Sequence, residues 1–346
     1  MLPETLKNYS SETIQKTVYK NYNQLLSSFY EMQTEFLRAR YKINKSIEIS
    51  NILTLLGKNL HLEIVRQREK DLDFDISLEN FLKINDFMRN NNYGVKTGYK
   101  IVSIVEQTGI PKETVRRKLK KLTDTKVITY SKETKLYYYN LQQRNEELFK
   151  NFIENDINAL AKFVSFVSKF LGLNLKVKFI ENEIKNQFSF YYYHYYNCQV
   201  EWMKMWQQQL KDVDLIFITI QALIPALQYS SSINNKNSSV KENLHSLIGK
   251  TKKDFIINKK STISASSISE ISGIPRATCI RKLQKLVGLG MLVKEMNTKR
   301  YFVNQSANER TKNIMKKDNV INSVNIFSDL LSVIISALTR NNSKDN

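Results

Sequence analysis

Apolar residues recur every three or four positions over long stretches of this chain, as they do along the buried face of an α-helix. Two such stretches occupy residues 22–36 and 188–202, and two more occupy 155–172 and 319–338. The apolar positions of the first two are Tyr22, Leu25, Phe29, Met32 and Phe36, and Phe188, Tyr191, Tyr195, Cys198 and Trp202. Proline and glycine, which interrupt helices, number only four and nine in 346 residues. The pattern therefore predicts a mainly α-helical fold.

Two shorter segments have the pattern of β-hairpins. Residues 127–140 place the β-like runs VITY and LYYYN on either side of a polar tip that contains Lys132 and Lys135. Residues 291–304, MLVKEMNTKRYFVN, have the same form. The sequence thus adds two small hairpins to the helices.

The chain contains an internal duplication. Without gaps, 16 of 38 positions are identical between 103–140 and 267–304, including a Gly-Ile-Pro triplet in each. Upstream, FYEMQTEFL (29–37) aligns more weakly with YYNCQVEWM (195–203). We therefore predict two successive units, each made of helices, a basic module and a further helix. The units are 1–174, with its module at about 78–140, and 175–346, with its module at about 245–304 and a mobile Ser/Asn-rich loop at 229–243.

The repeated segment reads EQTGIPKETVRRKLKKL at 106–122 and EISGIPRATCIRKLQKL at 270–286. Gly109 suits the left-handed residue that ends a helix, and Pro111 suits the first turn of the next one. In that next helix Val115, Leu119 and Leu122 share one apolar face, and basic residues cover the rest. The equivalent residues Cys279, Leu283 and Leu286 are expected to form the apolar face of the second copy. Each copy thus predicts a helix, a tight turn, a basic helix and a hairpin.

Positive charge is concentrated in these segments. The chain carries 53 Lys and Arg against 33 Asp and Glu, a net charge of +20. Residues 101–150 hold 11 basic and 6 acidic residues, and residues 251–300 hold 11 and 3. Charge placed in this way favours a polyanionic partner, nucleic acid before an anionic membrane surface.

These residues resemble the winged helix-turn-helix of bacterial transcription regulators. The shared pattern is S-I-x-E-x-[ST]-G-I-P-x-x-T-x-x-R-K-L-x-K-L followed by a hairpin, and the flanking helices are most similar to the MarR-type arrangement. The resemblance implies that the helix after the turn enters the major groove of double-stranded DNA while the wing touches the adjacent backbone or minor groove. Relatives of this kind are homodimers of one unit. This chain carries both units, so we expect tandem winged helix-turn-helix domains in a pseudo-two-fold, single-chain dimer.

The expected DNA contacts lie on the outer faces of the two basic helices and at the tips of the hairpins. They are Lys112, Glu113, Thr114, Arg116, Arg117, Lys118, Lys120, Lys121, Lys132 and Lys135 in the first copy, and Arg276, Thr278, Ile280, Arg281, Lys282, Lys285, Lys299 and Arg300 in the second. Residues common to both copies, such as Arg117 and Arg281, are expected to hold phosphates. Residues that differ, such as Glu113 against Ala277, predict two unequal half-sites.

Other functional classes find less support in the sequence. No G-x-x-x-x-G-K-[ST] loop, metal-ligand spacing or catalytic constellation is present, so we expect no enzyme activity, cofactor or metal. The aromatic stretch 188–197 predicts helix core, with a ligand pocket or a stacking platform as alternatives. A plasmid- or phage-type replication initiator, which also uses tandem winged helices, and a winged-helix protein that binds other proteins both stay open. So do a small-molecule effector and further homodimerisation through the C-terminal helices.

The expected location is the cytoplasm, in association with the nucleoid. Cys198 and Cys279 permit at most one disulfide, which favours a reducing compartment. The N-terminus lacks the basic and apolar regions of a signal peptide. The apolar runs 215–227 and 320–338 are short or interrupted by polar residues, so they predict buried helices and no membrane partner.

Overall fold

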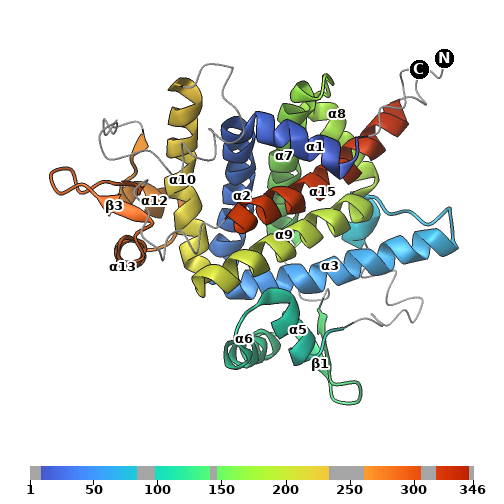
Figure 1. Cartoon of the computed structure of the whole chain (residues 1–346). Helices are drawn as coiled ribbons and strands as arrows, with labels where there is room; N and C mark the ends of the chain where they lie inside the picture. The colour runs from blue at the N-terminus through green and yellow to red at the C-terminus, as the bar shows by residue number, and fades with distance from the viewer. Residues whose placement is uncertain (1–8, 84–97, 141–145, 234–260, 305–316, 343–346) are drawn as a thin grey trace.

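The computed structural model describes residues 9–83, 98–140, 146–233, 261–304 and 317–342 (Figure 1). The elements of the first repeat are α1 (Ser11–Lys20), α2 (Tyr22–Asn44), α3 (Ile47–Lys70), α5 (Ile101–Thr108), α6 (Lys112–Asp124), β1 (Ile128–Ser131), β2 (Leu136–Tyr139) and α7 (Glu146–Phe170). Those of the second are α8 (Val177–Asn186), α9 (Phe188–Leu210), α10 (Val213–Ile233), α12 (Ala265–Ser272), α13 (Arg276–Gly288), β3 (Leu292–Lys294), β4 (Tyr301–Val303) and α15 (Lys317–Asn342). The fold is mainly α with two antiparallel hairpins, as the sequence predicts.

The two repeats interlock. Helix α3 packs on α9, and its counterpart α10 packs on α2. In the same way α2 packs on α7 as α9 does on α15, and α1 packs on α15 as α8 does on α7. The elements therefore follow one another in the same order in both repeats, and the repeats share one core.

The centre of this core is aromatic. Helices α2 and α9 cross there, with Phe36 edge-on to Tyr195 at 5.5 Å between ring centroids and Phe29 edge-on to Trp202 at 5.9 Å. The alignment of the repeats pairs Phe29 with Tyr195 and Phe36 with Trp202, so these two contacts are counterparts. Phe327 of α15 stacks on Phe29 at 4.6 Å. The 188–202 stripe is thus helix core, in agreement with the prediction.

One polar contact breaks the similarity of the halves. Arg40 is buried and donates two hydrogen bonds to the buried Asp156 carboxylate, Nη1 to Oδ1 at 3.1 Å and Nη2 to Oδ2 at 2.7 Å. Its guanidinium also lies over the Phe36 ring, 3.3 Å from the centroid. At the equivalent positions the second repeat has Trp206 and Val320, both buried and apolar.

Two segments differ from the expectations. Residues 229–233, predicted as part of a mobile loop, are the last residues of α10, while the rest of that loop and residues 84–97 and 245–260 of the two modules lie outside the described residues. The helix continues through the first serines of this stretch, where Ser230 Oγ accepts a hydrogen bond from Asn23 Nδ2 of α2 at 3.1 Å.

Two helices are long and apolar enough to cross a membrane, by length and composition only. They are Val213–Ser232 and Asp318–Arg340, and 61% and 50% of their apolar windows are buried inside the protein. The apolar face of α15 packs on α1, α7 and α9.

Each repeat places a small module, α5–α6–β1–β2 or α12–α13–β3–β4, on the outside of the helical body (Figure 1). Gly109 and Gly273 end the first helices of the modules with φ of 68° and 73°, as the Gly-Ile-Pro triplets predict. Ile110 and Ile274 behind them are buried. The first hairpin pairs Ile128 with Tyr139, and the second pairs Leu292 with Val303. Both modules therefore have the predicted local form.

Candidate nucleic-acid interface

The basic helix of the first module, α6, has one apolar face and one exposed charged face. Val115, Leu119 and Leu122 are buried against α3 and α9, in a cluster that includes Val200. Thr114 is half-buried. The exposed side chains are Lys112, Glu113, Arg116, Arg117, Lys120 and Lys121. A surface with this many exposed cations can bind phosphates.

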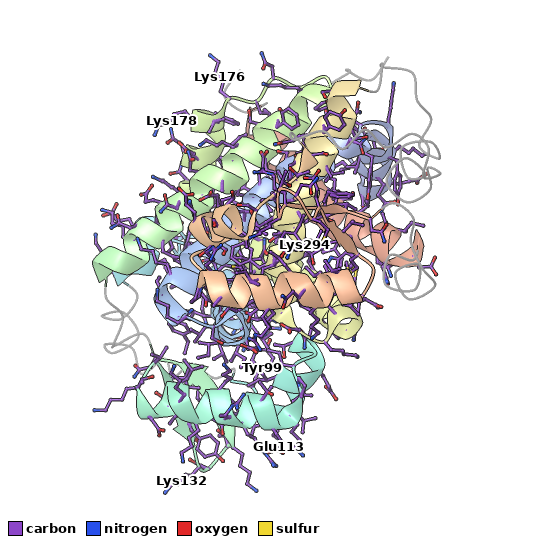
Figure 2. All side chains as sticks on the ribbon, turned by 90° about the vertical axis from the view of Figure 1, so that its left-hand side faces the viewer. Tyr99, Glu113, Lys132, Lys176, Lys178 and Lys294 are labelled. Carbon is purple, nitrogen blue, oxygen red and sulfur yellow. The ribbon has the colours of Figure 1, made fainter. Side chains whose placement is uncertain are left out.

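Within that face, Glu113 is not a free acceptor. Its carboxylate accepts a hydrogen bond from Arg116 Nη1 at 2.8 Å. Figure 2 shows Glu113 at the outer side of α6, directed away from the helical body. Any contact from Glu113 to a base has to compete with this exposed ion pair, which is weak in water.

The basic helix of the second module, α13, presents fewer charges. Arg276, Arg281 and Lys285 are exposed, and Thr278 is half-buried. Ile280, expected to face DNA, is half-buried and packs on the hydrophobic core. Its counterpart Arg116 is exposed, so equal positions in the alignment do not have equal surroundings. Burial of its apolar surface favours the contact of Ile280 with the core, whereas hydration of its guanidinium favours an exposed position for Arg116.

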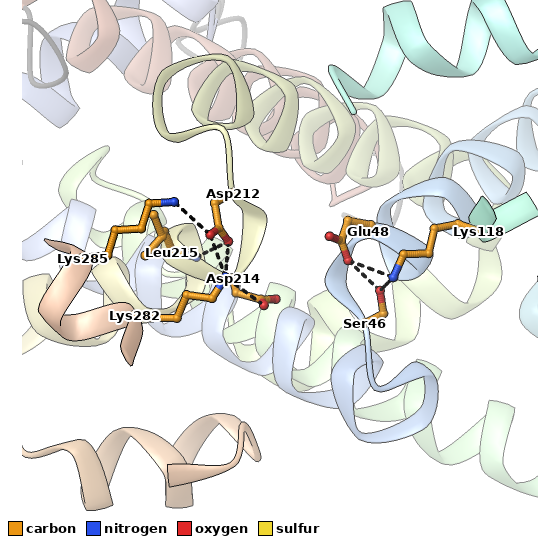
Figure 3. Close-up of polar contacts among 8 residues, drawn as sticks. All are labelled: Ser46, Glu48, Lys118, Asp212, Asp214, Leu215, Lys282 and Lys285. Atoms are coloured by element: carbon orange, nitrogen blue, oxygen red, sulfur yellow. Dashed lines mark hydrogen bonds and ion pairs between the residues drawn. The ribbon is translucent and has the colours of Figure 1, made fainter. Parts of the chain in front are cut away.

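The lysines at positions 118 and 282 point toward the helical body, which corrects their expected placement on the outer face. Lys118 Nζ donates to Ser46 Oγ at 3.0 Å and lies 3.4 Å from Glu48. Lys282 Nζ donates to both oxygens of Asp212 at 2.7 Å and lies 3.4 Å from Asp214 (Figure 3). These side chains are 19% and 12% exposed. We call Lys118 with Ser46 and Glu48 the first anchor, and Lys282 with Asp212 and Asp214 the second anchor.

The two anchors occupy equivalent positions and differ in charge. Each acidic or hydroxyl group sits at the start of α3 or α10, directly after a corner between two long helices. The first anchor has one carboxylate and one hydroxyl, whereas the second has two carboxylates and a further contact from Lys285 Nζ to Asp212 at 3.3 Å. Each anchor ties a basic helix to the body, and the second does so with more charge.

The electrostatics of the second anchor follow from burial and neighbouring charge. Burial acts to raise the pKa of Asp212, but hydrogen bonds and charges from Lys282 and Lys285 outweigh it and lower the pKa. Burial raises the pKa of Asp214, opposed by Lys282 and reinforced by Glu48 of the first anchor. Since α3 also contacts α10, the two anchors lie near one another.

The hairpins carry the remaining expected contacts. Lys132 and Lys135 are exposed at the tip of β1–β2, and Lys299 is exposed in the equivalent turn. Arg300 is half-buried, and its guanidinium donates to Thr262 Oγ1 at 2.7 Å and to the Thr262 carbonyl at 3.0 Å. Arg300 therefore holds the hairpin to the segment that precedes α12.

Histidines and cysteines show no arrangement for chemistry in the described part of the chain. No group of three or more His, Cys, Asp or Glu there is able to hold a metal ion. His61 is buried among Phe81, Phe188 and Tyr192, and burial lowers its pKa to about 3. His245 lies outside the described residues. Burial raises the pKa of the thiols at 198 and 279, which keeps both as unreactive thiols.

Sequence reasoning missed the anchors and the corners that carry them. A signal for them was present, because Lys-Ser-Ile-Glu (45–48) aligns with Lys-Asp-Val-Asp (211–214) at the spacing that relates α2 to α9. The pattern is four residues long and only its lysine is identical, so the sequence alone does not reveal its role. No protein-family model, curated protein or solved structure matches the chain in comparisons with known proteins.

Proposed function

We propose that this chain is a sequence-specific double-stranded DNA-binding protein that regulates transcription. In this proposal the two modules are tandem winged helix-turn-helix domains, and the chain is a pseudo-two-fold single-chain dimer. Helices α6 and α13 enter successive major grooves, and the hairpins touch the flanking backbone. The protein acts in the cytoplasm on the nucleoid and needs no cofactor or catalytic group.

The observation that carries the proposal is the common disposition of the two basic helices. Figure 2 shows α6 and α13 lengthwise, one above the other and roughly parallel, and Figure 1 shows each hairpin on the side of its module away from the other basic helix. Two recognition helices that enter adjacent major grooves have to lie about one helical turn of DNA apart, roughly 34–36 Å. Because both helices are carried by one shared core, their separation would be held constant on the DNA.

The exposed residues define the contacts. Arg117 and Arg281 are equivalent, exposed and without a salt bridge to a described residue, so they are assigned to phosphate or guanine contacts. Lys112, Lys120 and Lys121 extend the first face, and Arg276 extends the second. The unequal faces favour a site with two different half-sites.

The test is selection of bound sequences from a pool of random duplexes at moderate salt, repeated with Arg117→Ala and with Arg281→Ala. Two different half-sites about 10 base pairs apart, each weakened by its own variant, support the proposal. Tight binding without an enriched sequence favours the replication initiator or an architectural role. Absence of binding by the unaltered chain overturns the DNA proposal and leaves the helices as a protein-contact surface.

A further inference from the structure

Lysines occupy backbone positions that usually favour glycine or asparagine. Within the described ranges, the five non-glycine residues with positive φ are all lysines, and each is exposed. A side chain in this left-handed conformation brings Cβ close to the following carbonyl, which glycine avoids and asparagine tolerates. They are Lys45, Lys126, Lys135, Lys211 and Lys299, with φ between 51° and 58°. A cation retained at such positions points to a use for its charge.

Two of these lysines form the corners of the helical body. Lys45 ends α2 and donates its N–H to the Tyr41 carbonyl at 2.9 Å, and Lys211 ends α9 and donates to the Gln207 carbonyl at 2.9 Å. The next residues are Ser46 and Asp212, which bind Lys118 of α6 and Lys282 of α13. Each corner lysine is therefore adjacent in sequence to the residue that holds a basic helix.

The corners also lie between the two basic helices. Helices α3 and α10 begin at them and contact each other, and Figure 3 shows both anchors in one view with α6 and α13 held from opposite sides. Figure 1 shows the starts of α3 and α10 in the angle between the two modules. Lys45 and Lys211 are therefore exposed cations at the corners from which these two helices start.

We propose that Lys45 and Lys211 bind phosphates beside the minor groove at the centre of the DNA site, an inference that rests on the proposed function. When two helices occupy successive major grooves on one side of a duplex, the minor groove between them faces the protein. Its bordering phosphates then meet the corners. The proposal adds contacts at the middle of the site, where the basic helices and hairpins supply none.

A simpler reading is that each lysine complements the dipole at the end of its helix. The two readings separate on substitution by asparagine, which accepts the left-handed conformation and removes the charge. If the lysines act only on the helix ends, DNA binding is unaffected by the change. If they bind phosphate, binding weakens while folding is preserved.

The experiment compares Lys45→Asn/Lys211→Asn with a control that loses the same charge elsewhere, Lys176→Asn/Lys178→Asn. Lys176 and Lys178 are exposed at the end of the molecule far from α6 (Figure 2). Affinity of the full-length protein for a pool of mixed-sequence duplexes is measured from about 50 to 200 mM salt. The corner variant is expected to lower the slope of log K against log salt by about 2 and the affinity by roughly fivefold per lysine at about 0.15 M salt.

The thermal midpoint of the corner variant is expected to be unchanged or raised. A corner variant with the salt slope of the control overturns the inference. Arg117→Ala and Arg281→Ala report separately on the proposed function, because they alter the basic helices and leave the corners intact. If Arg117→Ala and Arg281→Ala lose DNA binding and the corner variant does not, the proposed function is supported. The contacts of Lys45 and Lys211 with phosphates are then refuted.

Discussion

The unequal anchors predict that the two basic helices are held with different strength. Replacing Lys282 by Met leaves the carboxylates of Asp212 and Asp214, 18% and 27% exposed, without their shared counter-ion. Replacing Lys118 by Met leaves Glu48, 31% exposed, and the buried Ser46 hydroxyl, which still donates a hydrogen bond to Glu48 at 2.7 Å. Both changes remove one positive charge and keep a side chain of similar length, so they form a matched pair.

The expected costs follow from burial. Breaking a fully buried ion pair costs about 3–5 kcal/mol, and an exposed pair is worth at most about 1 kcal/mol. The second anchor is mostly buried but keeps Lys285 at 3.3 Å from Asp212, so we expect Lys282→Met to cost about 2–3 kcal/mol. The first anchor has a single carboxylate at 3.4 Å, so Lys118→Met is expected to cost about 0.5–1.5 kcal/mol.

Urea unfolding of the whole chain gives the global cost, and amide hydrogen exchange shows whether the loss is confined to α13 or α6. The cost of Lys282→Met is expected to shrink in an Asp212→Ser background, because one of the two uncompensated carboxylates is then absent. Equal costs for the two lysine variants, or an unchanged exchange rate in α13 after Lys282→Met, would refute this reasoning.

Three further predictions concern the scaffold, each measured by urea unfolding. The pKa of His61 is about 3 in the folded protein and 6.5 in the unfolded chain, so its contribution to the free energy of unfolding is complete above pH 6.5. Below that pH the unfolded chain binds a proton that folded His61 does not, and stability falls by about 1.4 kcal/mol per pH unit. The variant His61→Phe is expected to remove this pH dependence. Arg40→Met or Asp156→Leu alone is expected to lower the free energy of unfolding by about 3–5 kcal/mol, because each leaves the other charge buried and unpaired. The double variant is expected to lose far less, and additive losses would contradict this explanation. Gly109→Ala costs about 1–2 kcal/mol; no loss contradicts the left-handed turn.

Local features of this fold are predictable from sequence because neighbouring residues determine them. The apolar spacing of 188–202 specifies which side of α9 is buried whatever it packs against. Gly109 and Pro111 end one helix and start the next through their own backbone preferences. The hairpins likewise follow from short β-like runs around polar turns. These features need no knowledge of distant parts of the chain.

The orientation of Lys118 and Lys282 is not predictable in this way. Both belong to helices whose other basic residues face water, and nothing within one helical turn distinguishes them. Their partners Ser46 and Asp212 lie 72 and 70 residues away in the same repeat and become neighbours only when each module packs on the helical body. A basic pattern therefore predicts the helix that carries the charge, while the long-range packing decides which cations remain free for a partner.

The differences between the repeats bear on why the two units share one chain. In a homodimer each half has the same sequence, so an ion pair such as Arg40–Asp156 occurs twice or not at all. Here one half keeps that buried pair and the other has Trp206 and Val320 at the same places. The anchors differ in the same manner, with one carboxylate against two. Since a covalent link allows each half to change independently, the outer faces of the two basic helices are also free to differ, which is what the proposed unequal half-sites require.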